Sequence, residues 1–163
     1  MDWERIKVPV LETAKWLCLV LAVLFIVMIS AGGRVSAAAF ADVAGAVTEV
    51  ADLSATQEGD NLMFKRLYGL DASDYEDILL YCPATNMGAE ELLLVKLSDT
   101  SQQDAVAAAM QARVDGQLNV FEGYGVDQCD MLSRSIIEVR GNYVLFVSAA
   151  DPAAVRQAFL SAL

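Results

Sequence analysis

The chain has 163 residues, enough for one globular domain and a short additional segment, and its 22 acidic residues outnumber its 11 basic residues to give a net charge of −11. This balance argues against a nucleic acid partner, because phosphates require a basic surface. The sequence has no histidine, which excludes the commonest general base, histidine-activated nucleophiles and imidazole metal sites.

An uncharged apolar run lies near the start of the chain. Between Lys15 and Arg34 there are 18 residues without a charge. A helix needs about 20 apolar residues to cross the hydrocarbon core of a bilayer, and apolar flanking residues supply the difference. We therefore predict that residues 16–33 form a transmembrane helix, so that the membrane itself is one partner of the protein.

The orientation of this helix follows from the positive charges around it. Three basic residues precede the run, whereas only Arg34 lies between the run and Lys65. The positive-inside rule then places the N-terminus in the cytoplasm. The predicted organisation is a single-pass signal anchor in the cell membrane, residues 1–35, followed by an extracytoplasmic domain, residues 36–163.

A cleaved signal peptide is the alternative to a retained anchor. Residues 37–39 and 39–41 both match a small-x-small cleavage pattern. Against cleavage, the apolar run is longer than the usual signal-peptide core of about 7 to 15 residues, and acidic residues interrupt the positive N-terminal region. The sequence favours the retained anchor and leaves cleavage open.

Two helices are predicted at the start of the extracytoplasmic part. Residues 36–53 are rich in alanine, and their larger apolar residues recur every three or four positions, which indicates one face of a helix. A polar stretch, residues 54–61, separates this helix from a second short helix that ends at Gly69. The acidic cluster at residues 71–77 lacks the spacing of a calcium loop and is interpreted as a turn.

Two strands are predicted next. The apolar runs 78–81 and 92–97 flank a loop and are expected to pair as an antiparallel hairpin, with a helix over residues 89–97 as the alternative. Glu90 and Glu91 precede the second run. Neighbouring side chains point apart on a strand, so these carboxylates are interpreted as solvated surface or as protection of a sheet edge.

The longest predicted helix spans residues 100–121. A capping box from Thr100 to Gln103 opens it, and Val106, Met110 and Val114 recur every four residues. The glycines that flank Tyr124 end this helix, and a short helical turn is expected over residues 127–134.

A hairpin and a last helix complete the chain. Gly141 and Asn142 separate two β-rich runs, 136–140 and 143–147, which is the pattern of a tight primed turn. Asp151 followed by Pro152 is typical of a helix start.

These elements predict an α+β fold with a mainly antiparallel sheet of about four strands and flanking helices, in the order ααββαββα. Both faces of the sheet are apolar, so either helices cover both faces or one face meets a partner. The long helix is expected to share a core with Val95, Val139 and Leu145. Cys82 and Cys129, assigned to two loops, are predicted to be free thiols.

The order of several motifs resembles a known bacterial family. These motifs are NLMFKRLYGLDASDYEDILLYCPATNMGAEELLLVKLSD, then FEGYGVDQ after the long helix, then IIEVRGNYVLFVSA. Over residues 40–163 the chain is similar to the family catalogued as domain of unknown function 4358. The resemblance implies an exported protein held by an N-terminal membrane segment or lipid. It implies no catalytic residue, metal or cofactor.

The expected function is a non-catalytic binding or protein-interaction module of the bacterial cell envelope, with a protein partner there. Its candidate contact residues are Tyr81, Asn86, Met87 and Tyr124, in or beside the predicted loops. No nucleophile stands at a recognisable spacing from a base, so no catalytic residue is assigned. The alternatives are a structural subunit of a membrane complex and, less favoured, a histidine-free envelope enzyme.

Overall fold

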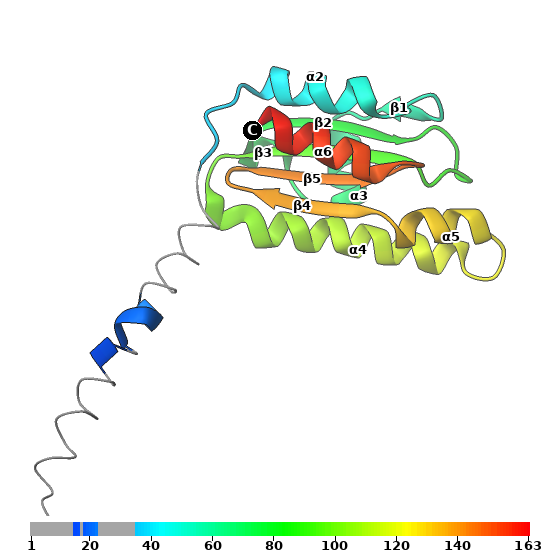
Figure 1. Ribbon diagram of the computed structural model, residues 1–163. Coiled ribbons are helices and arrows are strands. Elements are labelled where there is room, and N and C mark those ends of the chain that lie inside the picture. The colour runs from blue at the N-terminus through cyan, green and yellow to red at the C-terminus, as the bar shows by residue number, and fades with distance from the viewer. Residues whose placement is uncertain (1–14, 17, 23–34) are drawn as a thin grey trace, which may run out of the picture. The chain divides into compact units, whose positions relative to one another are not determined.

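The computed structural model in Figure 1 describes residues 15, 16, 18–22 and 35–163. The chain divides into two units, residues 1–34 and 35–163, and each is considered by itself. In the first unit, residues 15, 16 and 18–22 are helical. None of the helices described here combines the length and the apolar character that a membrane span requires. The predicted transmembrane helix, residues 16–33, lies mostly outside the described residues and stays a prediction.

The second unit has an α+β fold around one antiparallel sheet, confirming the predicted fold class. Its elements follow in the order α2 (Phe40–Val50), β1 (Thr56–Glu58), α3 (Asn61–Tyr68), the 3-10 turn η1 (Ala72–Asp74), β2 (Tyr75–Pro83), β3 (Glu91–Leu97), the 3-10 turn η2 (Thr100–Gln102), α4 (Gln103–Phe121), α5 (Val126–Ser133), β4 (Ile136–Arg140), β5 (Tyr143–Ser148) and α6 (Pro152–Ala162).

The sheet has five strands in the order β1-β2-β3-β5-β4, one more than the predicted four. The additional strand is β1, which lies in the polar stretch that the sequence assigned to a break. Its three residues pair with the end of β2, from Thr56 opposite Pro83 to Glu58 opposite Tyr81. A strand this short and polar has no apolar alternation, so only its pairing with β2 reveals it.

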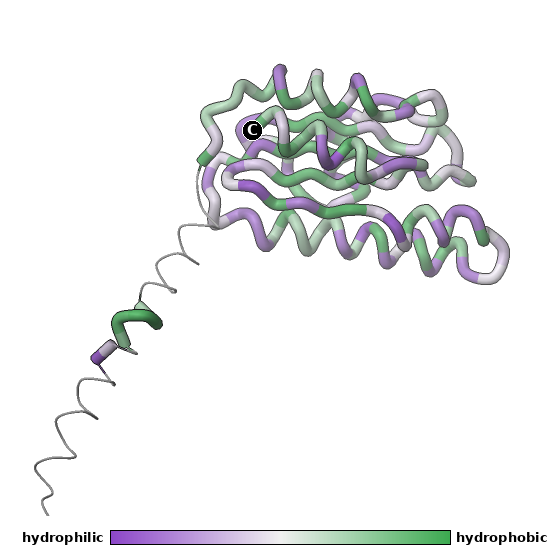
Figure 2. Tube along the Cα trace, viewed as in Figure 1, coloured by the Kyte–Doolittle hydropathy of each residue, from purple (hydrophilic) through white to green (hydrophobic). Residues whose placement is uncertain are grey.

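Helices cover both faces of the sheet (Figure 1). Of the two predicted possibilities, helices on both faces or one face left for a partner, the structure shows the first. On one face, residues of α3 and α4 pack against Leu93, Val95 and Leu97 of β3. On the other face, residues of α2 and α6 pack against Leu92 and Leu94. The alternation along β3 therefore feeds two separate cores. Figure 2 shows the corresponding hydrophobic colouring along the central strands.

The position of Leu145 corrects the predicted core. Leu145 is fully buried, but it lies in the cluster beneath α2 and α6 rather than under α4. Its neighbours Val144 and Phe146 face α4 instead. The prediction placed the residue one position out of register, and in a strand a shift of one residue reverses the face. Val95 and Val139 do pack with Met110, as predicted.

Local sequence signals account for most element ends. Gly69 ends α3 with φ of 70°, and Gly141 turns the β4–β5 hairpin with φ of 55°, conformations that glycine adopts without a Cβ clash. Asp151 caps α6 by accepting a hydrogen bond from the Ala154 amide at 3.1 Å. The capping box before α4 is formed by Asp99 and Gln102, one residue earlier than predicted, because η2 begins the helical path ahead of α4.

Candidate functional site

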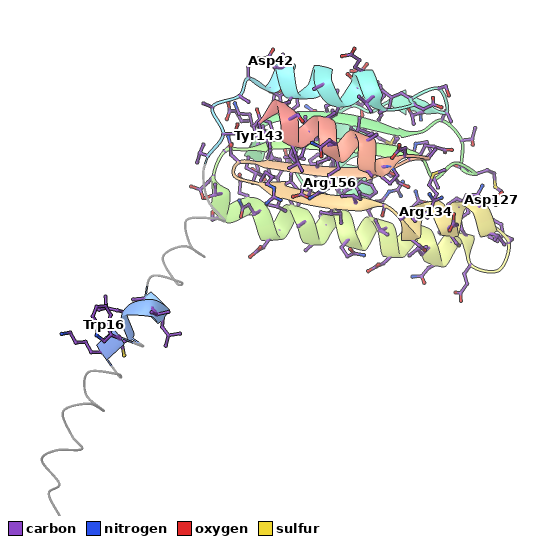
Figure 3. All side chains as sticks on the ribbon, viewed as in Figure 1. Trp16, Asp42, Asp127, Arg134, Tyr143 and Arg156 are labelled. Atoms are coloured by element: carbon purple, nitrogen blue, oxygen red, sulfur yellow. The ribbon has the colours of Figure 1, made fainter. Side chains whose placement is uncertain are left out.

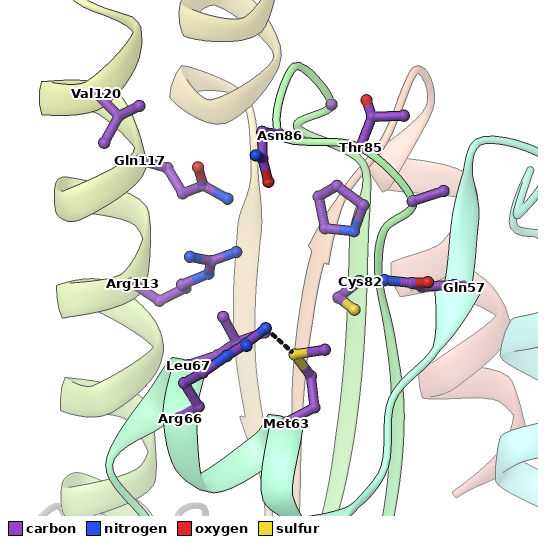
Figure 4. A pocket seen from close by; sticks show the side chains of 13 residues that line it. Gln57, Met63, Arg66, Leu67, Cys82, Thr85, Asn86, Arg113, Gln117 and Val120 are labelled. Atoms are coloured by element: carbon purple, nitrogen blue, oxygen red, sulfur yellow. Dashed lines mark hydrogen bonds between the residues drawn. The ribbon is translucent and has the colours of Figure 1, made fainter.

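A cleft lies between α3, α4 and the loop that follows β2 (Figure 4). Its volume is about 330 Å³, near the lower end of the range for small-ligand sites. It is lined by Gln57, Met63, Arg66, Leu67, Cys82, Pro83, Ala84, Thr85, Asn86, Gly88, Arg113, Gln117 and Val120. We call this feature the arginine cleft, because Arg66 and Arg113 are its only charged lining residues.

The two helices that form the walls are fixed by their local sequence. Asp60 begins α3 by accepting a hydrogen bond from the Met63 amide at 2.7 Å, and Gly69 ends the helix. Between these ends Phe64 and Tyr68 are buried, which turns Arg66 toward the cleft. On α4 the buried stripe of Val106, Met110 and Val114 holds the helix against the sheet, so that Arg113 stands beside that stripe.

A buried polar network lies behind the cleft. Arg113 donates from Nε and Nη2 to Oε2 of Glu91, at 3.1 and 2.9 Å, and from Nε to Oε1 at 3.3 Å. The Tyr68 hydroxyl donates to Oε1 of Glu91 at 2.6 Å. The Glu91 side chain is only 2% exposed, so this carboxylate depends on both partners for the hydrogen bonds that water would otherwise supply.

The network shifts the ionisation of its neighbours. Burial, together with the Glu91 carboxylate, raises the pKa of Tyr68 well above its ordinary value, so the phenol stays a hydrogen-bond donor. Burial and the same carboxylate also raise the pKa of the Cys82 thiol, which keeps it protonated. Neither group is therefore set up as a nucleophile at neutral pH.

Arg66 has few partners for a charged side chain. Its Nη2 donates to the Met63 sulfur at 2.8 Å, the contact drawn as a dashed line in Figure 4. Within residues 35–163 it forms no ion pair. Arg113 and Gln117 from α4 and Asn86 from the loop point into the same space (Figure 4). The charged side chains of the cleft are therefore both hydrogen-bond donors, and they lie beside amides that can donate and accept.

Three of the four predicted contact residues lie near one another. Asn86 lines the arginine cleft, and the Met87 carbonyl accepts a hydrogen bond from Gln128 Nε2 of α5 at 3.1 Å. Tyr124 lies in the turn just before α5, where its ring is 5.9 Å from that of Phe121. The buried contacts among Ala89, Phe121 and Leu132 also tie the loop to α4 and α5.

Tyr81 does not join this group. It lies on β2, half-buried against the cluster beneath α2 and α6, on the sheet face opposite the neighbouring Cys82. The prediction counted it as a contact residue because it is the last residue of the apolar run 78–81, beside the predicted loop. In the structure β2 continues to Pro83, so the side chain of Tyr81 belongs to the sheet.

Of Glu90 and Glu91, it is Glu91, the first residue of β3, that differs from the prediction. Glu91 is buried in the network with Tyr68 and Arg113, on a strand between β2 and β5, and so neither a solvated nor an edge position describes it. The chain alone carried a signal for this site. Glu91 continues the alternate row of Leu93 and Val95, and Arg113 follows Val106 by seven residues, two helical turns along the same face.

The first part of the acidic cluster forms a turn, as predicted, whereas Tyr75, Glu76 and Asp77 belong to β2. Asp71 accepts hydrogen bonds from the Ser73 amide at 3.2 Å and hydroxyl at 2.7 Å. It also pairs with Lys65 at 2.8 Å, and that contact holds the pKa of Asp71 well below its usual range. Among residues 15, 16, 18–22 and 35–163, no group of acidic or cysteine side chains is arranged to hold a metal ion.

The two cysteines of the second unit, Cys82 and Cys129, are free thiols in the structure. Their assignment to loops is wrong, since Cys82 lies on β2 and is buried, whereas Cys129 lies on α5 and is partly exposed.

Comparison with known proteins identifies one family. A family model described as "Domain of unknown function (DUF4358)" matches residues 49–149, more than half of the chain. The match runs from the end of α2 to just beyond β5 and includes both walls of the arginine cleft. No curated protein and no solved structure shows significant similarity to the chain.

Proposed function

The chain belongs to the DUF4358 family, and from that premise we propose that it is a non-catalytic protein-interaction domain of the bacterial cell envelope. In this proposal residues 16–33 anchor the protein in the cell membrane as a single-pass helix. The N-terminus faces the cytoplasm, and residues 36–163 lie outside it. The positive-inside pattern and the uncharged run of 18 residues support this topology.

One observation carries the interaction role. Four of the exposed large apolar side chains belong to the loop after β2 or to the segment from the end of α4 to the start of α5. Their exposed fractions range from 56% to 79%, and we call them the end patch: Met87, Val120, Tyr124 and Val126. Apolar side chains grouped on a surface favour a protein contact, whereas single exposed ones are ordinary.

The surroundings of the end patch suit a protein partner. The contacts that join the loop to α5, including the bond between Gln128 and the Met87 carbonyl, hold the backbone that carries Met87 against that helix. A prearranged surface loses less entropy when a partner binds. Met87 and Tyr124 are also residue types that interfaces favour, since a thioether adapts its shape and a phenol combines an apolar ring with a polar tip.

Site-specific photo-crosslinking tests this role. A photoreactive residue replaces Tyr124 in the full chain, expressed in its bacterial host, and another chain carries it in place of Val50, an exposed apolar residue on α2. We expect one discrete crosslinked protein from position 124 and none from position 50. Equal crosslinking at both positions, or none at position 124, would overturn the proposal.

A further inference from the structure

The arginine cleft has a charge opposite to that of the chain around it. The chain carries 22 acidic and 11 basic residues, yet two arginines and no acidic residue line the cleft. A randomly chosen part of so acidic a surface would carry more acidic than basic residues. Because the two arginines come from different helices, α3 and α4, their convergence is a property of the fold rather than of one basic segment.

Arg113 is held in place with part of its guanidinium unused. Its Nε and Nη2 bind Glu91, whereas Nη1 makes no hydrogen bond within residues 35–163. Glu91 is in turn held by the Tyr68 hydroxyl at 2.6 Å. The buried pair therefore positions Arg113 in advance, and a ligand would not need to order a flexible side chain.

The balance of charge at the cleft selects a monoanion. Arg66 and Arg113 carry two positive charges, and the buried Glu91 behind them carries one negative charge, which leaves one positive charge uncompensated. A single carboxylate neutralises that charge. A dianionic phosphate would add a negative charge that the cleft does not balance, in a chain that is already strongly acidic.

The remaining polar lining suits amide groups. Gln57, Asn86 and Gln117 each offer an amide donor and an amide acceptor, the same pair of functions as a peptide bond. Apolar side chains such as Leu67 and Val120 complete the walls. The volume of about 330 Å³ fits a small ligand or the end of a chain rather than a folded partner.

We propose that the arginine cleft binds the carboxylate of a small peptide-like ligand, with Arg66 and Arg113 on the carboxylate and the lining amides on the adjoining peptide groups. This site rests on the proposed binding role and adds a ligand of defined chemistry to it. The end patch lies next to it through Val120, which belongs to both.

A pair of dipeptides that differ only in the terminal group tests the proposal. The probes are N-acetyl-alanyl-alanine, which ends in a carboxylate, and its carboxamide, with inorganic phosphate as a third probe. Each is titrated into the full chain in nonionic detergent and followed by ¹H–¹⁵N NMR. We expect saturable shifts at Asn86 and Gln117 with the carboxylate and at least about tenfold weaker binding of the carboxamide.

Substitutions assign the effect to the cleft. Arg66→Gln should weaken carboxylate binding by at least about tenfold, because one charged donor is lost. Arg134→Gln is the matched control, since Arg134 is an exposed arginine immediately after α5 that pairs with Asp130 and lies outside the cleft (Figure 3). Arg134→Gln should change the affinity for the carboxylate by no more than about twofold, because an exposed charge outside the site has a small effect.

Three results would overturn the proposal: no saturable shift with the carboxylate, equal binding of the carboxamide, or tighter binding of phosphate. These outcomes are distinct from failure of the protein-interaction role, which the crosslinking at position 124 measures. If crosslinking occurs at position 124 but the carboxylate does not bind, the cleft proposal is wrong and the protein-interaction role stands. If the carboxylate binds but no crosslinking occurs, the protein-interaction role is wrong and the cleft proposal stands.

Discussion

Arg113 on α4 donates from Nε and Nη2 to one oxygen of the buried Glu91 on β3, at 3.1 and 2.9 Å. This contact joins a helix to the central part of the sheet at the back of the cleft. A buried ion pair is weak evidence for stability, because desolvation offsets the attraction between the charges. Removing one partner has a large effect, since it leaves the other charge buried without compensation.

Arg113→Met should therefore lower the free energy of unfolding by about 3 to 5 kcal/mol. Arg140→Met, which removes an exposed arginine paired with Glu138, should cost no more than about 1 kcal/mol. The double variant Glu91→Met with Arg113→Met should lose less than the sum of the single losses. Denaturant unfolding measures these three variants and the single variant Glu91→Met, and additive losses would show that the pair is not coupled.

The buried phenol predicts a pH dependence of stability. The pKa of Tyr68 is raised in the folded state by burial and by Glu91, while the unfolded value is about 10. Above pH ~10 the unfolded state loses this proton and the folded state retains it, so stability falls as pH rises through this range. Tyr68→Phe removes this contribution, and its stability between pH 9 and 11, roughly the range around the unfolded value, should fall less steeply than that of the parent chain. An unchanged slope would contradict the assignment.

Two core residues test the separate cores. Met110 of α4 packs in the core between that helix and the sheet, whereas Leu145 of β5 packs in the core beneath α2 and α6, and both are fully buried. Met110→Ala and Leu145→Ala should each cost about 2 to 5 kcal/mol. Asp115→Ala should have little effect, because this exposed side chain only accepts a hydrogen bond from Gln111 on the same helix. Similar midpoints of unfolding for all three variants would refute the arrangement.

The retained anchor is tested by sequencing the N-terminus of the protein in fractionated membranes. The residues at the predicted cleavage site contact the rest of the unit. Ser36 donates from its amide to Asn142 Oδ1 at 2.8 Å, and the Tyr143 hydroxyl donates to the Ala38 carbonyl at 2.9 Å. We expect the chain to keep its N-terminal segment. A mature form that starts between residues 38 and 42 would exclude the retained helix.

The thiols should differ in reactivity. Cys82 is buried and its pKa is raised, whereas Cys129 is partly exposed. We expect alkylation of the folded chain at pH ~8 to modify Cys129 first and Cys82 only after denaturation. Mass spectrometry without reductant locates the label. If the denatured, unreduced chain takes up no label at either residue, the two form a disulfide and the prediction is wrong.

Periodicity was enough for the elements with strong local signals. The stripe from Val106 to Val114 identified α4, and Gly141 with Asn142 identified the hairpin, because these patterns are set within one element. The strand β1 and the side of the sheet that Leu145 faces could not be found this way. Both depend on pairing between strands far apart in the chain.

The candidate site was only partly predictable. Asn86, Met87 and Tyr124 were chosen because loops carry exposed polar and aromatic residues, and the fold brings these loops together. Glu91 and Arg113 were missed because each is charged, and a charged residue is ordinarily solvated. The periodic patterns place each residue on a buried face, but the pairing of the two is visible only when α4 is laid across β3, which is a tertiary relationship.

The interaction role is tested most directly by purifying the chain from its own membranes in mild detergent. Light scattering then gives the mass of the particle that contains the chain. We predict a discrete complex that is lost when Met87→Ala and Tyr124→Ala are combined and is retained in Val50→Ala, which removes an exposed apolar side chain from α2. A chain that purifies alone, or a complex unaffected by the double substitution, would contradict the account.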